Sequence, residues 1–210
     1  MKSFPRPSTI TTDFEREAQL RGFRFVAGLD EVGRGALAGP VVAAAVILDP
    51  AKHIPQGLND SKQLSLKERE RIAAEVHDAA LAFSIGAIEA DEIDRINILQ
   101  ATKRAMLNAL GALQPAADYL LIDALKLHES PLPQKSIIRG DAVSASIAAA
   151  SVVAKVYRDR LMRDCETSYP GYGFARHVGY GTRIHLAALR TLGACPIHRR
   201  SFRPVFILRV

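Results

Sequence analysis

The segment from Val41 to Leu48 places the strongest constraint on the fold, because every one of its residues is apolar. It is short for a buried helix, and the turn-forming residues Gly39 and Pro40 stand directly before it. A short apolar run bounded in this way is typical of a buried strand. The chain is therefore expected to contain a sheet that other elements cover.

The rest of the sequence supplies further strands and the helices to cover them. Strands are predicted at 25–29, 82–88, 119–122 and 136–139. Helices are predicted from 12, from 65 to about 80, from 97 to 110 and from about 142 to near 166; the first two begin with the capping boxes Thr12–Glu15 and Ser65–Glu68. This order predicts a mixed-sheet α/β domain. We expect one domain over residues 1–210, since no linker or repeat interrupts the chain.

Composition excludes several classes of protein. Hydrophobic residues make up 48% and charged residues 24% of the chain, which excludes a disordered or fibrous protein. The N-terminus shows no secretory signal, and no apolar run reaches the roughly 18 residues that span a bilayer. Cys165 and Cys195 form no CxxC pair and indicate neither a zinc site nor a disulfide framework. We therefore expect a cytoplasmic protein without a membrane partner.

The positive charge is concentrated near the C-terminus. Residues 171–210 contain seven arginines and no Asp, Glu or Lys, whereas the other 170 residues hold 21 basic and 22 acidic side chains. Such a segment suits a polyanionic partner, because each neutralised phosphate releases counterions. A basic tail that only aids solubility is the alternative.

Four acidic residues stand at the ends of predicted strands or next to one. Asp30 and Glu31 follow the first strand, Asp123 follows another, and Asp141 precedes the long helix. Each alone is compatible with a turn or, for Asp141, a helix N-cap. Together they would repel one another, so they need either raised pKa values or a bound cation, and all-oxygen ligands favour Mg²⁺ or Mn²⁺. Two such ions would suit phosphodiester hydrolysis.

Other motifs leave alternatives. The glycines from Gly33 to Gly39 resemble a dinucleotide-binding turn, but a predicted strand follows where that motif needs a helix. The histidines are either structural or face phosphate, and the aromatic residues of the Gly-rich stretch either anchor a loop or stack on a nucleotide. These residues are His177, His185 and His198, and Tyr169, Tyr172, Phe174 and Tyr180.

Several blocks, taken together, resemble the ribonuclease HII family in its bacterial form. They occur in family order from about residue 24 to 206: GLDEVGRGALAGPV (28–41), NDSKQLS (59–65), EIDRINIL (92–99), GD (140–141), SIAAAS (146–151), HVGYGT (177–182) and CPIHRRSF (195–202). The resemblance implies a ribonuclease H-like fold, with a mixed sheet flanked by helices and a helical C-terminal segment. Residues from about 171 to 210 would form a substrate-facing extension of the single domain.

The resemblance also implies an activity. The family cuts the RNA strand of RNA–DNA hybrids and incises on the 5′ side of ribonucleotides embedded in duplex DNA, as in ribonucleotide excision repair. The expected products are 3′-hydroxyl and 5′-phosphate ends. The expected cofactor is a pair of Mn²⁺ or Mg²⁺ ions, of which one activates a water and the other stabilises the leaving oxygen.

Individual residues match family positions. The metal-binding and catalytic carboxylates are matched by Asp30, Glu31, Asp123 and Asp141. The substrate-binding positions are matched by Gly33, Arg34 and Gly35, which would sense the 2′-hydroxyl through the backbone, by Tyr180, which would pack on the neighbouring deoxyribose, and by Ser61 and Lys62 near phosphate.

The chain departs from the family pattern at a few positions. Val178 replaces a common lysine, Ala36 a common proline and Ala124 a frequent glycine, which bears on affinity and not on the class of reaction. The ending FILRV (206–210) lacks the features of a sliding-clamp peptide, so we expect no clamp partner. We expect a monomer.

Three rival functions remain. A resolvase of the same fold would share the acids but would cut DNA that lacks ribose. Ribonuclease HIII carries an additional N-terminal domain, and only about 24 residues precede the first predicted strand here. A hybrid-binding module without activity would not need all four carboxylates.

Overall fold

A computed structural model describes residues 10–58, 61 and 64–207. Five strands form one sheet in the order β3-β2-β1-β4-β5. Their bounds are β1 Val26–Val32, β2 Val41–Leu48, β3 Ala80–Ile88, β4 Tyr119–Asp123 and β5 Gln134–Ile137. β1 and β3 run antiparallel to β2, whereas β4 is parallel to β1 and β5 is parallel to β4. The predicted mixed sheet is confirmed.

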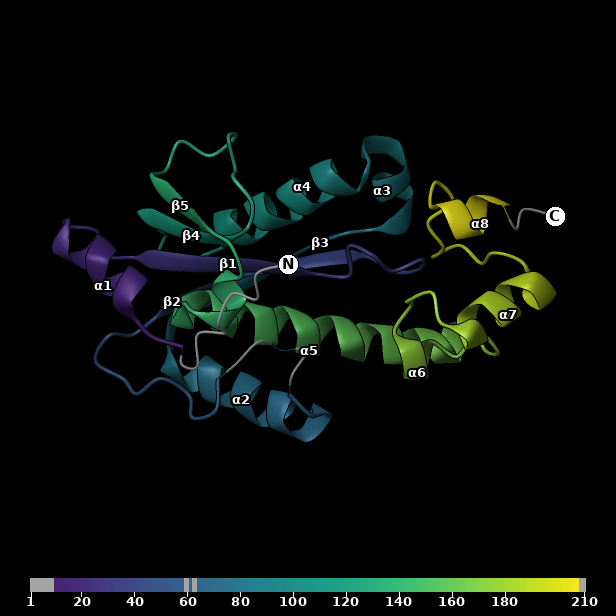
Figure 1. Cartoon of the computed structure of the whole chain (residues 1–210), viewed down its shortest axis with the longest axis horizontal. Helices are drawn as coiled ribbons and strands as arrows, with labels where there is room; N and C mark the ends of the chain where they lie inside the picture. The colour runs from purple at the N-terminus through teal and green to yellow at the C-terminus, as the bar shows by residue number, and fades with distance from the viewer. Residues whose placement is uncertain (1–9, 59–60, 62–63, 208–210) are drawn as a thin grey trace, which may run out of the picture.

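Helices cover both faces of this sheet (Figure 1). Helix α4 (Ile98–Gly111) packs on one face, and α5 (Ala145–Ser168) with α2 (Leu66–Ala79) packs on the other. Strand β2 separates two cores, because its alternate side chains point to opposite faces. Val41, Ala43, Ala45 and Ile47 face α4, and Val42, Ala44 and Val46 face α5 and α2.

Small residues bring α5 close to the sheet, as its Ser- and Ala-rich sequence predicts. A Cβ added to Gly28 of β1 would lie 2.1 Å from the backbone carbon of Ser146, so no larger residue fits there. The long helix therefore lies directly against β1. This contact fixes α5 relative to Asp30 and Glu31, which follow Gly28 along the same strand.

Of the two predicted capping boxes at helix N-termini, one is confirmed and one is wrong, and the alternative interpretation of Asp141 as a helix cap is excluded. The Ser65 capping box is confirmed by both of its hydrogen bonds. At α1 (Asp13–Leu20) the Thr12 side chain caps nothing, because Glu15 turns inward and accepts hydrogen bonds from Ser144 and Ser146 instead. Helix α5 is capped by Ser144 and not by Asp141.

The remaining elements are short helices. They are α3 (Ala90–Ile96), the 3-10 turn η1 (Gly140–Ala142), α6 (Phe174–His177), α7 (Arg183–Leu192) and α8 (Arg203–Ile207). The last three make the C-terminal segment helical and lie together at one end of the molecule (Figure 1). Among the described helices, none is both long and apolar enough to span a bilayer.

Candidate active site

Strand β1 carries the acidic pair inside its length rather than after its end. It continues through Val32, so the prediction that the strand stops at Leu29 is wrong. The parallel pairing of β1 with β4 aligns Leu29 with Ile122. Asp30 and Asp123 follow these two residues, so both acids lie at the same edge of the sheet.

Asp141 joins this edge through the segment after β5. The Asp123 carboxylate accepts a hydrogen bond of 2.6 Å from the backbone N–H of Gly140. Asp141 follows in the 3-10 turn and is buried. Because α5 begins only after Ser144, Asp141 is not needed as a helix cap. Three separate segments therefore bring the four predicted carboxylates to one end of the sheet.

The Asp30 carboxyl group is electrostatically unfavourable where it lies. It is only 4% exposed, and burial raises its pKa well above the usual value. The charges of Glu31 and Asp123 raise the pKa further, while hydrogen bonds from Ser151 and from the Glu31 N–H oppose the shift. A bound cation would offset this repulsion.

The donor set fits a divalent metal ion by its chemistry. Carboxylate oxygens are ligands of hard cations such as Mg²⁺ and Mn²⁺. Within the described ranges, no three His, Cys, Asp or Glu side chains are arranged as a group that could hold a metal ion. The repulsion at Asp30 is therefore the observation that supports a metal site here.

A cavity of about 520 Å³ opens beside the carboxylates. Its lining brings together five of the six residues predicted to bind substrate, Gly33, Arg34, Gly35, Ser61 and Tyr180, with the predicted metal ligand Glu31 and with Val32, Arg69, Ser151 and Lys155. Asp30, Asp123 and Asp141 are not among the lining residues. Lys62 lies outside the described residues, so its predicted role has no structural test.

Two buried arginines, Arg158 and Arg199, contact the Gly33–Gly35 turn. Gly33 has φ +89°, and a Cβ there would lie 2.2 Å from Nε of Arg158, so this position requires glycine. The guanidinium of Arg199 donates to the Arg34 carbonyl over 3.0 Å. The Arg34 side chain pairs with Glu31 over 3.1 Å. Gly35 has open space around its Cα.

Arg158 also connects this turn to the segment that carries Tyr180. Its guanidinium donates to the carbonyls of Ala38, Pro40 and Val178. The same group lies 5.6 Å from the centre of the Tyr180 ring. The turn and the tyrosine thus share one buried support, and their relative position is fixed by Arg158.

Ser61 reaches the acidic edge through a second serine. Its hydroxyl lies 2.9 Å from the hydroxyl of Ser151, which donates to Asp30. Ser61 is buried. The structure therefore connects Ser61 to the carboxylates by hydrogen bonds.

Two cations in the cavity wall were not predicted from the sequence. Arg69 of α2 and Lys155 of α5 both contact Asp159, over 3.3 and 2.7 Å. Burial lowers the pKa of Lys155, and Nε of Arg69 is buried without a hydrogen-bond partner in the described structure. The spacing of Lys155 and Asp159 by four residues was the one signal in the sequence.

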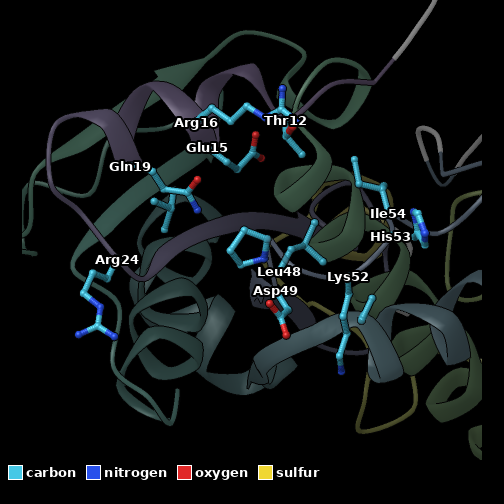
Figure 2. Close-up of a pocket in the computed structure, with 13 residues that line it drawn as sticks. Thr12, Glu15, Arg16, Gln19, Arg24, Leu48, Asp49, Lys52, His53 and Ile54 are labelled. Atoms are coloured by element: carbon cyan, nitrogen blue, oxygen red, sulfur yellow. The ribbon is translucent and has the colours of Figure 1, made fainter.

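A second cavity, of about 440 Å³, lies at the other end of the sheet (Figure 2). It is lined by α1, the start of β1 and the segment after β2, and it contains no predicted site residue. Of its two acids, Glu15 accepts hydrogen bonds from Ser144 and Ser146 through Oε1, while its Oε2 is buried without a partner among the described residues, and Asp49 accepts from the backbone of Ala51. The first cavity is therefore the candidate active site.

The C-terminal arginines divide into two kinds. Arg199 is fully buried and bonds to backbone carbonyls, so it does not face solvent. Five others are exposed: Arg176, Arg183, Arg190, Arg200 and Arg203. Arg209 lies outside the described residues. Residues 208–210, the end of the segment that we expect not to bind a sliding clamp, lie outside them as well.

The histidines and two of the aromatic residues are structural. His177, His185 and His198 are buried, and the rings of Tyr172 and Phe174 stack at 5.2 Å among them. This confirms the structural alternative for these residues.

Comparison with known proteins agrees with this arrangement. The ribonuclease HII family model matches residues 27–205. The chain is 53% identical to ribonuclease HII of Acetivibrio thermocellus, over 93% of this chain and 76% of that protein. It is 50% identical to ribonuclease HII of Syntrophotalea carbinolica, over 98% of both chains.

Solved structures show the same fold. Ribonuclease H2 from Pyrococcus horikoshii superposes with a TM-score of 0.73 at 25% identity, covering 88% of this chain and 97% of that one. Ribonuclease HII from Archaeoglobus fulgidus, solved in complex with PCNA, gives 0.74 at 22% identity, over 85% and 95% of the two chains. The chain belongs to the ribonuclease HII family and is an endoribonuclease that acts on the RNA strand of RNA–DNA hybrids.

Proposed function

We propose that this ribonuclease also incises duplex DNA on the 5′ side of a single embedded ribonucleotide, leaving 3′-hydroxyl and 5′-phosphate ends. The observation that carries the proposal is the shared cavity, in which the Gly33–Gly35 turn and Tyr180 lie beside Glu31. A nuclease that cuts at one ribonucleotide must recognise a 2′-hydroxyl close to its reacting groups. In this cavity the backbone of the Gly33–Gly35 turn lies close to the Glu31 carboxylate.

The metal-binding groups in this proposal are Asp30, Glu31, Asp123 and Asp141. The family depends on divalent metal ions, and a related ribonuclease HIII of the same fold was solved with Mn²⁺. Two bound ions would supply an activated water and charge stabilisation for the leaving oxygen. The protein's own contribution is to hold the carboxylates at one edge, through the β1–β4 pairing and the Gly140 N–H on Asp123.

Recognition of the ribonucleotide is assigned to the turn and the tyrosine. A 2′-hydroxyl both donates and accepts hydrogen bonds, and backbone groups of a glycine turn can meet both needs. The open space at Gly35 lets a sugar approach this backbone. Tyr180 is half-buried beside it and presents an aromatic face for the neighbouring deoxyribose. The 2′-hydroxyl is a recognition group here, not the nucleophile.

Phosphate contacts are assigned to the cavity wall and the C-terminal extension. Ser61, Arg69 and Lys155 line the cavity, and Lys62 follows Ser61 in sequence. The exposed arginines of residues 171–207 add positive charge outside the cavity. Because a basic segment suits phosphate contacts, residues 171–210 are proposed as the substrate-facing part of a single domain that works as a monomer.

A labelled 20-mer DNA duplex with one ribonucleotide tests the proposal. The duplex is incubated with Mg²⁺, with Mn²⁺ and with EDTA, beside an all-DNA duplex and an RNA–DNA hybrid. We expect one cut on the 5′ side of the ribonucleotide, none in EDTA and none in the all-DNA duplex. Cleavage of the hybrid alone would contradict the junction activity, and cleavage of the all-DNA duplex would favour a resolvase.

A further inference from the structure

Three buried histidines lie directly behind the Tyr180 segment and outside the cavity. His177, His185 and His198 are 7%, 0% and 1% exposed. The rings of His177 and His185 stack with their centres 4.4 Å apart. Nε2 of His185 lies 2.9 Å from Nε2 of His198. Two ring nitrogens at this distance form a hydrogen bond only if one carries a proton and the other does not.

The neighbouring backbone groups determine which nitrogen carries the proton. The Cys195 N–H donates to Nδ1 of His198 over 3.0 Å, so the His198 proton is on Nε2. That N–H donates to Nε2 of His185, which therefore holds its own proton on Nδ1. The acceptor of the His185 Nδ1–H is the Tyr180 carbonyl, 2.9 Å away. A directional chain thus runs from Cys195 to Tyr180.

His177 holds the peptide on the other side of Tyr180. The Gly179 N–H donates to Nδ1 of His177 over 3.3 Å, which leaves the His177 proton on Nε2 to meet the Tyr172 carbonyl at 2.8 Å. The Tyr180 N–H donates to the His177 carbonyl. The two stacked rings therefore bind the Gly179 N–H and the Tyr180 carbonyl, one backbone group on each side of the Tyr180 Cα.

The Tyr180 segment needs such support because its backbone is strained. Val178 and Gly179 both have positive φ, +43° and +86°. A β-branched residue in this region is unfavourable and persists only where the surroundings hold it. Burial lowers the pKa of His185. Burial, together with the repulsion that a protonated His185 would exert, lowers the pKa of His198 to about 4. Both rings are therefore neutral near pH 7.

We propose that His185 is a positioning residue for substrate recognition: through its Nδ1–H, oriented by His198, it fixes the Tyr180 carbonyl and so sets the tyrosine ring against the sugar. This inference rests on the proposed role of Tyr180 at the ribonucleotide junction. It assigns to the histidines no contact with substrate, since none of them lines the cavity.

Two variants of similar size separate this role from general packing. His185→Asn places an amide N–H where Nδ1 lies and so retains a donor for Tyr180, although it removes the acceptor of the His198 Nε2–H. His185→Gln places its amide where Nε2 lies and loses that donor. We expect His185→Gln to lower kcat/KM on the single-ribonucleotide duplex about tenfold, the effect of one unpaired buried acceptor, and His185→Asn to retain most of the activity.

Combining these changes with Tyr180→Ala shows whether His185 acts through the tyrosine. We expect His185→Gln to have no further effect once Tyr180 is removed. Additive losses, or equal losses in the Asn and Gln variants, would overturn the inference while leaving the junction activity in place. If Tyr180→Ala itself retained full activity, the proposed role of Tyr180 would be wrong, and the role of His185 would be wrong with it.

A measurement on the unmodified protein keeps the inference testable if a variant does not fold. The ¹⁵N chemical shifts of the imidazole rings distinguish the two neutral tautomers. Near pH 7 we expect a proton on Nδ1 of His185 and on Nε2 of His177 and His198. A proton on Nε2 of His185, or a doubly protonated ring, would overturn the inference.

Discussion

Two buried polar regions, one around Asp30 and one around His198, differ in how their polar groups are satisfied. In the histidine region each imidazole has partners for both ring nitrogens, and the rings of His185 and His198 are neutral near pH 7. At Asp30 the carboxylate is buried against two other carboxylates, Glu31 and Asp123. Asp30 is as buried as the three histidines, but only the carboxylate region brings side chains of like charge together.

This difference indicates which region performs chemistry. A fully hydrogen-bonded buried group stabilises the fold and needs no ligand. A buried cluster of like charges costs free energy unless a ligand of opposite charge binds. We therefore propose the carboxylate region as the catalytic site and the histidine region as its support.

The largest effect is expected from Asp123→Asn. Removing one carboxylate from the proposed metal site should lower turnover on an RNA–DNA hybrid by roughly 10³-fold, about 4 kcal/mol of lost charge stabilisation. Binding of the hybrid in Ca²⁺ should largely survive, because the cavity wall is unchanged. Single-turnover cleavage and a binding titration measure the two quantities.

Asp118→Asn is the matched control for this variant. Asp118 precedes the same strand, and its carboxylate accepts from the backbone N–H groups of Arg24 and Phe25. We expect its turnover to stay close to that of the unmodified enzyme. Equal losses in both variants would show that Asp123 acts on stability and not on catalysis.

The histidine region should make stability depend on pH. The folded pKa of His198 is about 4 against an ordinary 6.5, so the unfolded chain binds the proton more readily. The corresponding stability, about 3 kcal/mol, is present above pH 6.5 and is lost as the pH falls to 4. Urea unfolding at several pH values should show a shallower dependence for His198→Gln. Parallel curves would contradict the assignment.

Substitution of the two glycines of the turn should have unequal effects. Gly33→Ala combines a positive φ with a clash against Arg158 and should cost about 1–2 kcal/mol in backbone strain alone. Gly35→Ala meets no atom within 4 Å and should leave the fold unchanged. Thermal unfolding and KM on the single-ribonucleotide duplex distinguish them. Equal unfolding midpoints would show that the Gly33 turn is not held as described.

The smallest effect concerns the exposed arginines. Each arginine that contacts a phosphate should, when changed to glutamine, reduce the slope of log affinity against log salt by about 0.9. Arg104→Gln on α4 serves as the control outside the C-terminal segment, since its side chain pairs with Glu92. Unchanged slopes for all five exposed C-terminal arginines would contradict the substrate-facing role of residues 171–207.

Much of the fold and the acidic edge could be predicted from the sequence. Apolar runs locate all five strands to within a few residues, and each carboxylate follows or ends such a run. The sequence left a helix cap open as the alternative role of Asp141, because local sequence does not distinguish Asp141 from Ser144 as the cap. The inward orientation of the Glu15 side chain could not be predicted either, because its hydrogen-bond partners are about 130 residues away in the sequence.

The supports of the site could not be predicted. Arg158 and Arg199 have other basic residues nearby in the sequence, a pattern that predicts solvent-exposed side chains. Both side chains are instead buried and donate hydrogen bonds to backbone carbonyls. The pairing of His185 with His198 depends on a tertiary contact between α7 and the segment after it. Such contacts leave no periodic signal in the chain.

Thermal unfolding of the unmodified protein and of Asp30→Asn, each with EDTA and with Mn²⁺, tests the central claim most directly. Without metal we expect the variant to unfold at a temperature a few degrees higher, since relief of about 1 kcal/mol corresponds to roughly 2–4 °C in a chain of this size. With Mn²⁺ the order should reverse, because only the unmodified site gains a balanced charge. A variant that is less stable in EDTA, or an equal Mn²⁺ shift in both proteins, would contradict the claim that the buried carboxylates form the metal site.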